Sequence, residues 1–194
     1  MHQNKYRMKK SLLIATFLVS IFSFAQKDCE YSSNVKDSLG IYRSTIDYVM
    51  HEKVFGNSQT SIFFSLINAD GMPSLNMQMI QKSVDFIPAK CLDKSSKIYL
   101  QLQNGKIITL IGLDQETCGN AVRNNNENCR ILSAYFLFLK DTMEDLKKSP
   151  ISIFRIKFAG ETIDYIAKES LVSEVDKKSY QPDHFFMDYL KCIE

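Results

Sequence analysis

The residues whose types and spacing best suit ligand binding lie in one long polar insertion, 114–130 (DQETCGNAVRNNNENCR). Asp114, Glu116, Asn126 and Glu127 offer carboxylate and amide oxygens, which are the ligands that calcium prefers. Their spacing differs from that of the twelve-residue calcium loop with its central glycine. We therefore interpret the insertion as a solvated connecting loop. The alternative is a ligand-binding loop, because long loops in compact domains often carry function.

The two histidines that follow residue 26, His51 and His184, are the other residues with catalytic potential. A metal or acid–base site would need both of them, although they come from opposite ends of the sequence. Asp183, beside His184, is better explained as a helix cap or as a partner of the helix dipole. The chain has no nucleophile elbow, phosphate-binding loop, dinucleotide fingerprint, His-Glu-x-x-His motif or Cys-x-x-Cys motif. We predict no catalytic residue, no metal site and no cofactor.

Cysteine usage indicates an oxidising compartment with two disulfides and one spare thiol. The five cysteines are Cys29, Cys91, Cys118, Cys129 and Cys192. A two-residue turn at Asn104-Gly105 would set position 91 opposite position 118, which favours a Cys91–Cys118 bond. Cys29 and Cys192 are then the natural second pair, and Cys129 is spare. A local Cys118–Cys129 bond is the competing scheme.

Three segments are predicted to form β-hairpins, because each has a favoured turn between runs of alternating apolar residues. The turns are Asp70-Gly71, Asn104-Gly105 and Gly160-Glu161. The pairs expected across them are Leu66 with Leu75, Leu102 with Ile107, Phe158 with Ile163, and Lys157 with Asp164. In the second hairpin the opposite face, which carries Tyr99 and Gln101, is only partly polar.

The remaining segments complete an α+β pattern. Residues 42–54 suit an opening strand, although a helix is possible there, and residues 131–139 (ILSAYFLFL) suit a central strand. A short helix is expected after Asp141, and a C-terminal helix after Pro182. The helix stripe of Phe186, Tyr189, Leu190 and Ile193 is expected to pack on the sheet. The predicted fold is a twisted, mainly antiparallel sheet or open barrel, built from hairpins and covered by these two helices.

The first 25 residues are typical of a secretory signal peptide. A positive start is followed by an apolar stretch from Leu12 to Phe24 and by small residues before a cut at Gln26. The stretch is shorter than the roughly 20 residues that cross a bilayer, so no transmembrane segment is expected after cleavage. We predict a signal peptide over 1–25 and a single domain over 26–194.

The charge balance gives no support for nucleic-acid binding. The chain has 24 Lys and Arg against 22 Asp and Glu, a formal net charge of +2. Four of the basic residues and none of the acidic ones lie in residues 1–25, which leaves a net charge of −2 for the rest. The apparent basicity is therefore a feature of the leader.

The leader end Phe24-Ala25-Gln26 is similar to that of secreted proteins from certain Gram-negative bacteria. The C-terminal half, with Ser149-Pro150-Ile151, Phe154-Arg155-Ile156, Phe185-Phe186 and Leu190-Lys191-Cys192, resembles small uncharacterised exported proteins of that group. The resemblance implies export, to the periplasm or the cell exterior, and carries over no activity, ligand or catalytic residue.

These observations favour an exported, disulfide-stabilised binding or structural module whose partner is a protein or a small molecule. One alternative is a small exported hydrolase that uses the 114–130 loop with His51 or His184. Another is a carrier of apolar ligands, suggested by residues such as Phe64, Met77 and Met79. An enzyme requires a histidine near a carboxylate in a concave pocket, a carrier requires an internal apolar cavity, and a binding module requires an exposed apolar patch.

Overall fold

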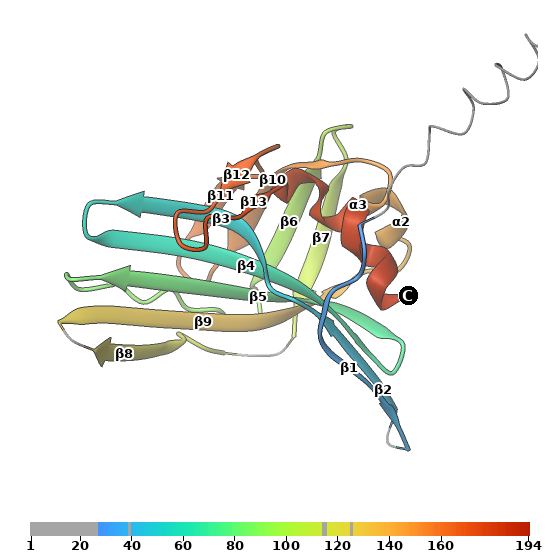
Figure 1. Cartoon of the computed structure of the whole chain (residues 1–194), viewed down its shortest axis with the longest axis horizontal. Coiled ribbons are helices and arrows are strands. Elements are labelled where there is room, and N and C mark those ends of the chain that lie inside the picture. Colours follow the sequence, from blue (N-terminus) through green and yellow to red (C-terminus); the bar gives the residue numbers. More distant parts are fainter. Residues whose placement is uncertain (1–26, 39, 114–115, 125) are drawn as a thin grey trace, which may run out of the picture.

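The computed structural model describes residues 27–38, 40–113, 116–124 and 126–194. Most of these residues belong to one open sheet of eleven antiparallel strands (Figure 1). Its strands are β1 (Tyr31–Asp37), β2 (Gly40–Thr45), β3 (Tyr48–Phe55), β4 (Ser58–Ala69), β5 (Met72–Ser83), β6 (Lys97–Leu102), β7 (Ile107–Gly112), β8 (Asn120–Asn124), β9 (Glu127–Phe138), β10 (Ile151–Lys157) and β11 (Thr162–Ile166). A two-stranded ladder joins β12 (Leu171–Val172) to β13 (Ser179–Tyr180).

The helical segments are short. Helix α2 (Met143–Leu146) follows Asp141, as predicted, and η1 (Pro182–His184), α3 (Phe185–Tyr189) and η2 (Leu190–Ile193) form one continuous C-terminal helical segment. Strands with a terminal helix confirm the predicted α+β class. The predicted opening strand is present as two strands, β2 and β3, and no part of 42–54 is helical.

The sheet bends because its longest strands change partners along their length. The strand order is β1-β2-β4-β5-β9-β7-β6-β10-β11, with β3 also paired to β4 and β8 also paired to β9. One end of β4 pairs with β3 and the other end with β2. In the same way β9 pairs with β8 at its start and with β7 at its end. The sheet thus has a first half around β4, β5 and β9, and a second half of β7, β6, β10 and β11 that runs in a different direction (Figure 1).

The first hairpin has the predicted register, with Leu66 opposite Leu75 across the turn at Asp70-Gly71. Both turn residues have positive φ, 51° for Asp70 and 82° for Gly71, as a type I′ turn requires. Leu66 and Leu75 are fully buried, so the predicted apolar face is the core face.

The predicted register of the second hairpin is wrong by one residue. The Leu102 amide donates to the Lys106 carbonyl, and the Leu102 carbonyl accepts from the Gly105 amide. These two hydrogen bonds close a three-residue loop that ends in Gly105, whose φ is 86°. Ile107 therefore pairs with Gln101 instead of Leu102. Because a one-residue slip exchanges the two faces of a strand, Ile108 faces the core while Ile107 is 61% exposed.

The predicted register of the third hairpin is wrong by two residues. The Phe158 amide donates to the Glu161 carbonyl, so the turn is centred on Ala159-Gly160. Asp164 pairs with Arg155, not with Lys157. An even shift leaves each side chain on its predicted face.

One apolar core joins both halves of the sheet to the C-terminal segment. The ring of Phe64 in β4 lies 5.2 Å from that of Phe154 in β10, and 6.1 and 6.3 Å from those of Phe185 and Phe186. These are distances at which aromatic pairs attract one another. Phe186, Leu190 and Ile193 of the predicted stripe are buried, and Tyr189 packs against the same core.

Both disulfides favoured on the sequence are present, Cys29–Cys192 and Cys91–Cys118, and Cys129 is free. The Cys91–Cys118 bond forms although the register of its hairpin differs by one residue from the predicted register. The Gly112 amide donates to the Ser96 carbonyl, whereas Leu92 pairs with Thr117. Three residues separate 92 from 96 and four separate 112 from 117, so the extra residue brings Cys118 back opposite Cys91.

The two disulfides are expected to contribute unequally to stability. They join cysteines 163 and 27 residues apart, and a longer closed loop removes more entropy from the unfolded chain. Replacing Cys91 and Cys118 by alanine should lower the free energy of unfolding by about 3–4 kcal/mol, and replacing Cys29 and Cys192 by about 5 kcal/mol. Urea unfolding of both double variants measures the difference. A Cys118–Cys129 peptide in non-reducing mass mapping would contradict the pairing itself.

Candidate functional site

Among its described residues, the 114–130 insertion does not bring its candidate ligand oxygens together. Asp114 lies outside the described residues. Glu116 is exposed before β8, whereas Asn126, with a φ of 67°, and Glu127 lie at the turn after β8. The five residues of β8 separate the two groups by roughly 15 Å. Among the described residues no cluster of three or more His, Cys, Asp or Glu side chains is suited to a metal ion.

The two histidines have different surroundings. His51, in β3, packs its ring against Tyr165 in β11 at 5.0 Å between centroids. His184 belongs to η1, in the C-terminal segment. Figure 1 places the β8 turn at the far end of the sheet from that segment. The arrangement that the hydrolase alternative needs, an insertion residue close to a histidine, is not present in the described part of the chain.

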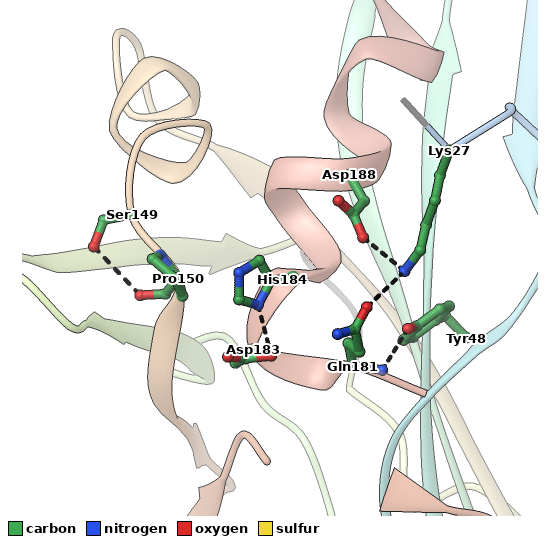
Figure 2. Close-up of polar contacts among 8 residues, drawn as sticks. All are labelled: Lys27, Tyr48, Ser149, Pro150, Gln181, Asp183, His184 and Asp188. Atoms are coloured by element: carbon green, nitrogen blue, oxygen red, sulfur yellow. Dashed lines mark hydrogen bonds and ion pairs between the residues drawn. The ribbon is translucent and has the colours of Figure 1, made fainter. Parts of the chain in front are cut away.

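The Asp183–His184 pair contains a buried carboxylate (Figure 2). Asp183 is 1% exposed, and its Oδ1 lies 2.9 Å from Nδ1 of the half-exposed His184. The contact lacks hydrogen-bond alignment, and neither oxygen of Asp183 accepts a hydrogen bond from the residues that the structure describes. Neither η1 nor α3 has a side-chain cap, so the interpretation of Asp183 as a helix cap is wrong. Asp183 does lie in the first turn of η1, the position that its other interpretation, as a partner of the helix dipole, requires.

In the described part of the chain, no hydroxyl or thiol group forms a hydrogen bond with this pair. The nearby Ser149 hydroxyl donates to the Pro150 carbonyl at 3.5 Å (Figure 2), and it accepts from the Asn104 amide at 3.3 Å. Both of these partners are backbone groups, whereas a serine hydroxyl used for catalysis needs a base as its partner. We assign the pair a structural role beside β10.

A groove with mixed chemistry lies elsewhere, on the outer face of the second half of the sheet. Its volume is about 430 Å³, within the range of small-molecule sites. It crosses three strands and is lined by Tyr99, Gln101, Ile107, Thr109, Ile153 and Arg155. Gln101, Ile107, Ile153 and Ile166 stand side by side on β6, β7, β10 and β11. We call this set the isoleucine row.

A second row of polar groups forms the other wall of the groove. Thr109, Tyr99, Arg155 and Asp164 stand side by side on β7, β6, β10 and β11, and we call them the donor row. Arg155 and Asp164 form a two-point ion pair, with Nη2 2.7 Å from Oδ2. The hydrogen bonds from Arg155 lower the pKa of Asp164. The two rows are two residues apart along each strand, or roughly 7 Å.

This groove was not predicted from the sequence, because it depends on the pairing of β6 with β10, about fifty residues away in the chain. The only available signal was the partly apolar outer face that Tyr99 and Gln101 share. The free thiol of Cys129 lies on β9 opposite Val122 of β8, away from these strands.

Comparisons with protein-family models, with curated proteins and with solved structures found no match. Within the described residues, no helix combines the length and apolar character that crossing a membrane requires.

His51 should make stability depend on pH. Burial lowers its pKa, and the charges of Lys168 and Lys53 lower it further. Below the unfolded-state value of about 6.5 the unfolded chain binds the proton more readily, so the free energy of unfolding falls as pH decreases. His51→Phe keeps a ring against Tyr165 and removes the titration. Thermal unfolding at about pH 7.5 and about pH 5 should show a smaller loss in the variant than in the wild type; equal losses would contradict this.

His184 should stabilise the fold through Asp183. The imidazole lies 2.9 Å from the buried carboxylate without forming a hydrogen bond, so His184→Gln removes only this polar contact and should lower the free energy of unfolding by about 1 kcal/mol or less. Asp183→Asn removes the buried charge and should recover most of that loss in the His184→Gln background. Urea unfolding of the two single variants and the double variant gives the coupling energy. Strictly additive effects would show that the two side chains do not interact.

Proposed function

We propose that this chain is an exported binding module that recognises its ligand on the outer face of β7, β6, β10 and β11. The observation that carries the proposal is the groove itself, where an apolar row and a hydrogen-bonding row meet on rigid strands. A largely apolar site with a few placed polar groups is typical of small-molecule recognition. The two disulfides support an oxidising compartment, and the leader supports export.

The inner face of the sheet is filled, which directs recognition to the outer face. Phe64, Met77 and Met79, the residues that suggested an apolar carrier, are each at most 1% exposed. They belong to one continuous core with the C-terminal segment. A carrier needs internal space at this place, and these side chains occupy it.

The Cys91–Cys118 bond supports the groove directly. It closes the segment that carries β6 and β7, and these two strands supply four of the six lining residues. A covalent closure at the base of the hairpin limits the motion of its strands. Preorganised sites bind more tightly, because less ordering entropy is lost on binding.

The test begins with the full precursor, expressed in a Gram-negative host and recovered in oxidised form outside the cytoplasm. Amide NMR spectra are recorded with a fragment set of apolar carboxylates, apolar amines and neutral sugars. We expect the largest shifts in β6, β7 and β10, and a loss of these shifts in Tyr99→Ala. Tyr135→Ala is the matched control, since Tyr135 is 37% exposed on β9 in the first half of the sheet. Shifts confined to other strands, or lost only in the Tyr135 variant, would refute the proposal.

A further inference from the structure

We propose that the groove binds a small soluble amphipathic anion, with an apolar body on the isoleucine row and a carboxylate, sulfate or phosphate group on the donor row. This inference rests on the proposed function and names the chemical class of its ligand. Three independent features support it: exposed apolar surface, hydrogen-bond donors without protein acceptors, and an excess of positive charge.

The apolar side is defined by the isoleucine row. Ile107 and Ile166, at its two ends, are 61% and 68% exposed. Ile153 lies between them on β10 and lines the groove. Exposed apolar groups aligned across neighbouring strands are a surface that an apolar body would cover favourably. Burial of this surface would supply the affinity that the polar wall alone lacks.

The opposite wall presents donors. Arg155 directs Nε and Nη2 to Asp164, and within the described residues its Nη1 makes no hydrogen bond, although the group carries five N–H donors. Tyr99 stands directly beside Arg155 in the row. Thr109 follows on β7. Arginine with neighbouring hydroxyls is a frequent means of binding carboxylate and phosphate groups.

The charge around the groove has the same sign. Two residues further along the strands, Lys97 on β6 and Lys157 on β10 stand opposite one another on the same face. Asp93 lies near Lys157, and Asp164 is the carboxylate within the rows themselves. The face is locally positive on a chain whose net charge after residue 25 is −2. Such a field attracts anions, and it opposes the packing of two copies through this face.

Asp164 is the natural competitor of the ligand. It occupies two of the Arg155 donors in the free protein, so an incoming anion must share or displace it. Removing that carboxylate without changing its shape should therefore favour anion binding. A purely structural role of the Arg155–Asp164 pair predicts the opposite, because its loss would loosen the site.

The experiment compares three probes with the same eight-carbon chain, namely octanoate, octylammonium and octyl glucoside, each below its micelle concentration. Affinities come from NMR titration of the oxidised protein. We expect octanoate to bind in the groove at least about tenfold more tightly than octylammonium. Arg155→Gln should weaken the binding of octanoate by about tenfold, and Asp164→Asn should strengthen this binding several-fold. Arg123→Gln, on β8, is the matched control and should leave the affinity unchanged.

The outcomes separate the two proposals. Equal binding of all three probes in the groove, or weaker octanoate binding in Asp164→Asn, overturns the anion inference and leaves the binding groove in place. The inference is also overturned if Arg123→Gln reduces the affinity for octanoate as much as Arg155→Gln does. Equal effects would show that the affinity depends on the net charge of the protein and not on a site in the groove. If none of the probes, and none of the fragments described above, binds in the groove, both proposals fail.

Discussion

The shared core between the two halves of the bent sheet is the constraint on which the other features depend. Phe64 touches aromatic rings from β10 and from the C-terminal segment, so one side chain links three parts of the chain that are distant in sequence. The last residues are held in addition by the Cys29–Cys192 bond and by hydrogen bonds from Tyr31, Arg43 and Asn68 to backbone carbonyls of residues 192–194. The buried side chains of the described residues form one continuous core on the inner face of the sheet.

The accuracy of the sequence-based predictions follows the strength of the local signals. At Asp70-Gly71 the turn type, the alternation and the burial agree, and the whole register is as predicted. In the second hairpin, residues 107–111 (IITLI) carry isoleucine or leucine on both faces of the strand. The pattern alone therefore cannot identify which face is the core face. The three-residue loop ending in Gly105 decides it. In the third hairpin an even slip changed the partners and kept the faces, which is why the core residues of β10 and β11 were still identified correctly.

The candidate site could not be predicted in the same way, because it is a product of long-range pairing. Tyr99 and Thr109 are neighbours within one hairpin, and their approach follows from local rules. Arg155 joins them only because β10 pairs with β6, and nothing in either segment specifies that pairing. The oxygen-rich insertion drew attention through its composition, yet β8 holds its ends apart. Composition identifies residues capable of chemistry, whereas topology decides which of them meet.

The Arg155–Asp164 pair has a second consequence, which concerns the edge of the sheet. β11 is the last strand in its order, and an edge strand with exposed apolar residues such as Ile166 invites pairing with another chain. Asp164 sits in the middle of this strand and is part of an exposed ion pair with Arg155. Charge on an edge disfavours strand addition, so the backbone of β11 is protected by the same contact that shapes the donor row. One carboxylate therefore both places charge on the exposed edge and occupies two of the donors of Arg155.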